Sequence, residues 1–186
     1  LKTQNPLQRA PGFSIGLETL DRELFDLQAV LPALKILPVK KARIQSGWFR
    51  CEPVADTYHF AWLDDCVNKL LALGIEPWIS VGYGNKAYMP DVDVYGAVGW
   101  VPYYSGTAMK AWLKYVAKLA ARYQGKVTYF EIWNEPWEKG MWVNDTPNPY
   151  DYAAFAIPTM KAMRAANPGT KFVTGFVTLS ATALNF

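Results

Sequence analysis

The chain has 186 residues, enough to bury the core of one domain, and its formal net charge at pH 7 is +3. Hydrophobic residues make up 51% of the sequence, which excludes a disordered chain. The small, evenly spread charge argues against nucleic acid as a partner. No apolar stretch approaches the roughly 18 residues that a membrane span requires, so we expect no membrane partner either.

Strand-like and helix-like segments alternate along the chain. Reading for hydrophobic periodicity predicts strands at 12–20, 40–48, 75–84, 126–136 and 170–179. The same reading predicts helices at 21–37, 61–74, 107–125 and 151–169. Pro32 interrupts the first of these helices, and Gly74 and Gly125 close the second and third.

This alternation predicts parallel βα units with right-handed crossovers. An open doubly wound sheet and a (β/α)8 barrel both fit the order. The first strand-to-helix turn holds no Gly-x-Gly-x-x-Gly motif and no P-loop, which removes the main argument for a nucleotide-binding sheet. We therefore predict an α/β fold, the N-terminal portion (about five βα units) of a (β/α)8 TIM barrel. Residues 1–186 would form part of one catalytic domain.

Polar and aromatic side chains gather where the predicted strands end, as in barrel enzymes. The two longest strand-to-helix loops, 84–106 and 136–150, leave that end and are rich in Tyr, Trp, Pro and Gly. Such loops suit a ligand with flat apolar faces and many hydroxyls, so we expect a carbohydrate. The eight tryptophans either line this cleft or fill an unusually aromatic core. The candidate substrate-binding residues are Asn134, Arg43, Gln45, Trp48, Trp78, Tyr83, Asn85 and Trp137.

Two carboxyls belong to the fourth predicted strand. Glu131 lies inside an otherwise apolar segment, so its carboxyl needs a partner, and Arg43 is the natural one. This pair is expected to be structural. Glu135 lies where Pro136 forces the chain to turn. Aromatic neighbours would favour its protonated form, which a general acid needs. Taken from the residues alone, Glu135 is either catalytic or a turn-stabilising residue.

The stretch Phe-Glu-Ile-Trp-Asn-Glu-Pro-Trp at 130–137 resembles the strand-four signature of the clan A glycoside hydrolases. Residues 47–85 and 122–136 are similar to the corresponding regions of family 39 and related β-xylosidase-like members. The resemblance covers 13–178, and Trp-Asn-Glu-Pro is its most specific part. It implies a retaining β-glycoside hydrolase acting on β-linked oligo- or polysaccharides.

Position by position, the resemblance implies roles for three residues. Glu135 resembles the general acid/base, and Asn134 the ligand of the sugar 2-hydroxyl. Arg43 resembles the strand-two arginine that supports the nucleophile. Gln45 departs from the family pattern, because many members have His there. No metal or organic cofactor is implied.

The resemblance also implies a missing part. A closed barrel needs three more units, and in the clan the nucleophile is a second Glu at the end of strand seven. We expect it outside this chain, on a remaining barrel segment that completes the fold. The alternative is a non-catalytic carbohydrate-binding half-barrel. Localisation stays open: the sequon at Asn144 slightly favours a secreted or periplasmic protein. Cys51 and Cys66 are not expected to form a bridge.

Overall fold

The computed structural model describes residues 13–143 and 146–174, so the sequon at Asn144 and residues 175–179 of the last predicted strand lie outside the described part. Within it, five parallel strands form one sheet in the order β1-β2-β3-β4-β5. Their bounds are Ser14–Leu17 for β1, Lys41–Gln45 for β2, Glu76–Val81 for β3, Tyr129–Ile132 for β4 and Lys171–Thr174 for β5. Each strand pairs with the next one along the chain, as successive βα units require.

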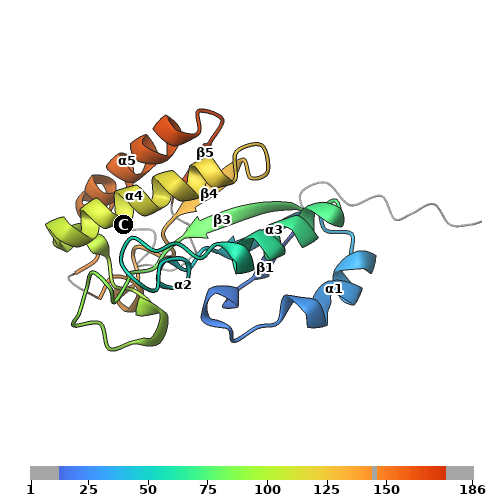
Figure 1. Cartoon of the computed structure of the whole chain (residues 1–186), viewed down its shortest axis with the longest axis horizontal. Helices are drawn as coiled ribbons and strands as arrows, with labels where there is room; N and C mark the ends of the chain where they lie inside the picture. The colour runs from blue at the N-terminus through green and yellow to red at the C-terminus, as the bar shows by residue number, and fades with distance from the viewer. Residues whose placement is uncertain (1–12, 144–145, 175–186) are drawn as a thin grey trace, which may run out of the picture.

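Helices connect the strands. The α-helices are α1 (Leu27–Ile36), α2 (Trp48–Cys51), α3 (Ala61–Ala72), α4 (Gly106–Arg122) and α5 (Pro149–Ala166), and the 3-10 helices are η1 (Leu20–Arg22), η2 (Tyr95–Ala97), η3 (Pro102–Tyr104) and η4 (Lys139–Met141). In Figure 1 the arrow of β3 points toward the side of the molecule that holds α2 and the long loops. This side carries the carboxyl ends of the strands.

The first helix differs from its prediction. It begins at Leu27, where Asp26 accepts a hydrogen bond from the backbone N–H of Gln28 as an N-cap. Pro32 lies inside the helix and does not interrupt it. Pro32 is exposed, so water can satisfy the backbone carbonyl that loses its partner. The chain before Leu27 forms η1 instead of a first helical turn.

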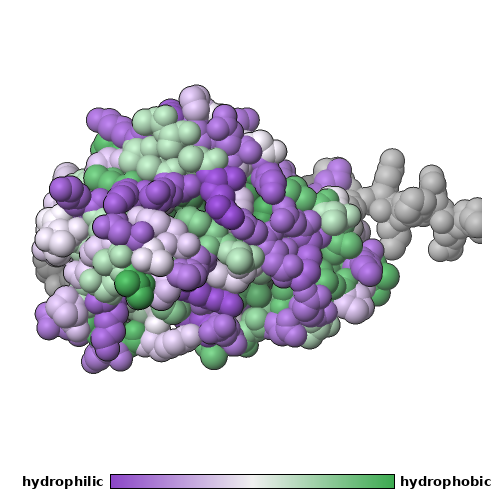
Figure 2. All heavy atoms as spheres, viewed as in Figure 1, coloured by the Kyte–Doolittle hydropathy of each residue, from purple (hydrophilic) through white to green (hydrophobic). Residues whose placement is uncertain are grey.

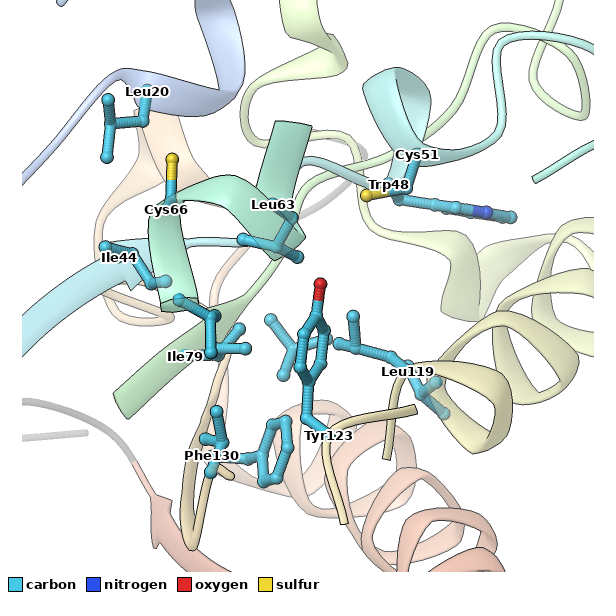
Figure 3. Packing of buried hydrophobic residues seen from close by; sticks show 14 of the residues in the cluster. Leu20, Ile44, Trp48, Cys51, Leu63, Cys66, Ile79, Leu119, Tyr123 and Phe130 are labelled. Carbon is cyan, nitrogen blue, oxygen red and sulfur yellow. The ribbon is translucent and has the colours of Figure 1, made fainter. Parts of the chain in front are cut away.

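The core lies between the sheet and the helices (Figure 3). Alternate strand residues such as Ile44, Ile79 and Phe130 point to the helices and are fully buried. Cys66 belongs to this core, and Cys51 and Cys66 are both buried free thiols. Much of the aromatic content is also core, because Trp48, Trp112, Trp133 and Trp142 are all 0% exposed.

The other face of the sheet carries the alternate strand residues. Arg43, Trp78 and Glu131 lie there, and beneath them a hollow of about 280 Å³ extends to Tyr129 and Val173. Apolar residues also reach the surface around α1, where Leu24 and Ile36 are exposed (Figure 2). None of the helices described is both long and apolar enough to cross a membrane.

Candidate active site

The chain turns sharply where β4 ends. Trp133 and Glu135 have positive φ values of 68° and 45°, a region that side-chain-bearing residues rarely adopt. Two hydrogen bonds fix this turn: the Trp133 indole donates to the carbonyl of Met141 at 2.7 Å, and the Tyr152 hydroxyl donates to the carbonyl of Ile132 at 2.9 Å. The turn holds Asn134 and Glu135 just beyond the carboxyl end of β4.

Arg43 contacts residues at the ends of three other strands. It does so on the face of the sheet that points away from the helices, called the inner face below. Its Nε and Nη2 donate to the two carboxylate oxygens of Glu131, both at 2.7 Å. Its Nη1 donates to both oxygens of Glu18 at 2.7 and 2.8 Å, and Nη2 also reaches Ser80 Oγ at 3.0 Å. This confirms the expected Arg43–Glu131 pair. Since the Glu131 side chain is 3% exposed, the paired charge satisfies an otherwise buried carboxylate.

The Arg43 guanidinium stays protonated. Burial acts to lower the pKa of Arg43, but hydrogen bonds and charge attraction from Glu131, followed by Glu18, outweigh it and raise that pKa above its ordinary value. Arg43 is therefore a fixed cation. It can orient acceptors around it but cannot serve as a proton donor.

Arg43 also orients the amide of Asn134. Asn134 Oδ1 accepts from Arg43 Nη2 at 2.9 Å, so the carbonyl side of the amide faces the arginine. Its Nδ2 then points to the other side and donates to Glu135 Oε2 at 3.3 Å. The result is an amide donor and a carboxyl side by side, both partly exposed.

These groups open into a pocket of about 420 Å³, a size typical of small-ligand sites. Its lining residues are Glu18, Arg22, Arg43, Gln45, Tyr83, Asn134, Glu135 and Met141. The pocket therefore brings together five of the predicted residues: Glu135, Asn134, Arg43, Gln45 and Tyr83. A cis peptide bond joins Gly82 to Tyr83.

Gln45 and Tyr83 form one wall of the pocket. Gln45 Nε2 donates to the Tyr83 hydroxyl at 3.1 Å, and Gln45 Oε1 accepts from Arg22 Nη2 at 3.1 Å. Burial raises the pKa of the Tyr83 hydroxyl, so it ionises even less readily than an ordinary tyrosine.

Four predicted binding residues do not line this pocket. Trp48 and Asn85 are buried: the Trp48 indole donates to Glu52 Oε2 at 2.7 Å, and Asn85 Nδ2 donates to the carbonyl of Glu52 at 2.8 Å. Figure 3 shows Trp48 among the core residues. Trp78 lies deeper, donating to Glu131 Oε2 at 3.1 Å, and Trp137 is only 3% exposed. Trp78 differs from the other three, because it is partly exposed and lines the separate hollow beneath Glu131.

The sequence reading missed Arg22 and Met141 as pocket residues and left Glu18 without a role. Arg22 was placed inside a helix, whereas η1 turns it toward the end of β1. Its position a few residues after a strand end was the only signal. In the described part of the chain, no group of three or more His, Cys, Asp or Glu side chains could hold a metal ion.

Comparisons with known proteins identify the fold. No family model and no curated protein matches the chain. Among solved structures, a family 39 enzyme from Xanthomonas axonopodis pv. citri has a TM-score of 0.63 at 24% identity, over 90% of this chain and 35% of that one. An endoxylanase of family 10 from a sugarcane soil metagenome has a TM-score of 0.59 at 14% identity, over 92% and 50%. An exo-β-1,4-mannosidase from Opitutaceae bacterium strain TAV5 has a TM-score of 0.66 at 13% identity, over 91% and 33%.

Proposed function

We propose that this chain supplies the acid/base half of a retaining β-glycoside hydrolase of clan A, with β-linked oligo- or polysaccharides as substrates. Its fold is that of the N-terminal part of a TIM barrel, and it spans between a third and a half of the matched structures. One observation carries this proposal. Asn134 and Glu135 share a pocket at the carboxyl ends of parallel strands, with the Asn134 amide oriented by Arg43.

Glu135 would act twice in this reaction. It first protonates the leaving oxygen of the glycosidic bond, and its carboxylate then removes a proton from the incoming water. Asn134 Nδ2, already aimed away from Arg43, would donate to the sugar 2-hydroxyl. Hydrogen bonds to this hydroxyl strengthen in the transition state and therefore raise the rate.

The second carboxyl of the reaction is expected on a later strand. Retaining enzymes place their two carboxyls about 5–5.5 Å apart, and the second attacks the anomeric carbon. Arg43 would support that nucleophile as well as Asn134. Glu18 holds the Nη1 side of Arg43 in this structure. The remaining strands would cover the inner face of the sheet next to it.

The test is a kinetic comparison in a protein that carries the completed barrel. Glu135→Ala should lower kcat/KM by about 100-fold or more on substrates with poor leaving groups, and much less on aryl glycosides whose leaving group needs no proton. Glu138→Ala is the matched control, because Glu138 lies outside the pocket lining. Equal losses on both substrate classes, or none, would contradict the acid role of Glu135. Sugar binding without any turnover would instead favour the carbohydrate-binding half-barrel.

A further inference from the structure

A second hollow lies next to the pocket, on the loop between β3 and α4. It encloses about 320 Å³, and its wall includes Phe49 from α2 and Tyr95 from η2. Lys86 and Asp93 are exposed and lie on the same wall. The hollow therefore combines aromatic surface with one cationic and one anionic side chain. Neither the resemblance nor the proposed reaction assigns it a role.

Only one layer of side chains separates this hollow from the pocket. Arg22, which lines the pocket, packs directly on Gly96, which lines the hollow. A Cβ on Gly96 would lie 2.9 Å from Arg22 Cγ and 3.2 Å from Phe49 Cε1, and the φ of Gly96 is +76°. Glycine here lets the loop lie close against η1 and α2.

The Tyr95 ring is restricted by two contacts and is still exposed to solvent. It meets the Phe49 ring edge-on, with centroids 5.5 Å apart, and its hydroxyl donates to Glu23 Oε2 at 3.5 Å. These contacts restrict the ring, yet Tyr95 is still 59% exposed. An aromatic face fixed in this way suits the apolar face of a pyranose ring, because little conformational entropy is lost on binding.

We propose that this hollow is a subsite for a further sugar unit of the same chain that occupies the pocket. The inference rests on the proposed function. Tyr95 would stack on the sugar ring, while Asp93 accepts hydrogen bonds from sugar hydroxyls and Lys86 donates to them. A subsite beside the pocket favours substrates long enough to reach Tyr95 while one of their sugars occupies the pocket.

Calorimetric titration of the full chain tests this subsite. The probes are β-1,4-linked xylo-, cello- and manno-oligosaccharides of two and six units. The unsubstituted chain should bind one of the hexasaccharides about five- to tenfold more tightly than its disaccharide, and Tyr95→Ala should remove this gain. Tyr95→Phe keeps the ring and should keep the gain. Tyr150→Ala, at an 84% exposed tyrosine outside both hollows, should behave like the unsubstituted chain.

The outcomes separate this inference from the proposed function. If Asn134→Ala weakens binding of both probe lengths while Tyr95→Ala weakens neither, the subsite is wrong and the pocket stands. A loss in Tyr95→Phe equal to that in Tyr95→Ala would overturn the stacking role. No binding of any probe by the unsubstituted chain, or equal binding of both probe lengths, would overturn the subsite, whereas the proposed function is tested by the Glu135→Ala kinetics.

Discussion

Arg43 shows how one residue can organise a site without reacting. Its fork binds both oxygens of Glu131, and the same Nη2 turns the Asn134 amide so that the donor side faces Glu135. The Glu131 carboxylate is almost fully buried, so it depends on this one cation. Positioning and stability are therefore coupled at Arg43.

Removing Arg43 should be costly for this reason. We expect Arg43→Met to lower the free energy of unfolding by about 3–5 kcal/mol, because it leaves a buried carboxylate without its partner. The double variant Arg43→Met/Glu131→Met should recover much of this loss, since no buried charge is then unpaired. Urea unfolding measures both. A double variant as unstable as the sum of its single variants would contradict this account.

Asp21 and Asp64 should respond to pH in opposite directions. Burial raises the pKa of Asp21, which is 0% exposed, so the folded chain favours its protonated form. The stability from this group is present below the unfolded pKa of about 3.9 and is lost as pH rises through the folded pKa. Asp21→Asn should therefore gain stability relative to the unsubstituted chain between pH 4 and pH 7.

Asp64 provides the matched comparison. A hydrogen bond from Arg122 lowers the pKa of Asp64, so its contribution is present above the unfolded pKa and lost as pH falls through the folded one. Asp64→Asn should be less stable than the unsubstituted chain at pH 7, by at most about 1 kcal/mol at this partly exposed pair, and the deficit should shrink in acid. Denaturant unfolding at several pH values checks both signs. Parallel pH trends for the two variants would refute them.

At the scale of elements, the predictions succeeded where periodicity is long and regular. The four predicted helices and five predicted strands all have counterparts in the structure. Helix α4 is an example of a regular pattern, because it buries Trp112, Val116 and Leu119 at helical spacing. The error at the first helix came from η1. Thr19 and Glu23 flank η1 with positive φ values. Neither residue type predicts this conformation from the sequence.

The same reasoning explains which site residues could be foreseen. Asn134, Glu135, Arg43 and Gln45 follow from strand ends alone, since parallel strands bring those ends together. The side chain of an aromatic residue near a strand end could not be assigned to ligand or core, because both environments favour it. Trp48 enters the core since α2 turns inward immediately after β2, which only the folded chain shows.

Helix α5 offers a test at this scale. Asn148 Oδ1 accepts from the backbone N–H of Asp151 at 2.8 Å, which satisfies an N–H that the helix itself leaves free. Asn148→Ala should lower the free energy of unfolding by about 1 kcal/mol, whereas Gln124→Ala, at an exposed residue outside α5, should change it little. Thermal or urea unfolding measures the difference. Equal stabilities of the two variants would show that the cap contributes nothing.

At the scale of the whole molecule, the five strands form an open sheet whose inner face carries the site. Arg43 and Glu131 lie at the centre of this face, and Asn134 and Glu135 lie just beyond the carboxyl end of β4. A hollow lined by Trp78 and Tyr129 lies beneath Arg43 and Glu131. In a closed barrel, further strands would cover this face. Under the proposed function, the acid/base belongs to this chain and the nucleophile to the strands that would complete the barrel.

Azide rescue of Glu135→Ala, in a protein with the completed barrel, tests this assignment most directly. With the acid/base removed, the glycosyl-enzyme intermediate formed from an aryl glycoside whose leaving group needs no proton should accumulate, and azide, which needs no general base, should release it. The account predicts a faster turnover with azide and a β-glycosyl azide as the product. An α-glycosyl azide would mean that Glu135 is the nucleophile, and no rescue would contradict its role as the acid/base.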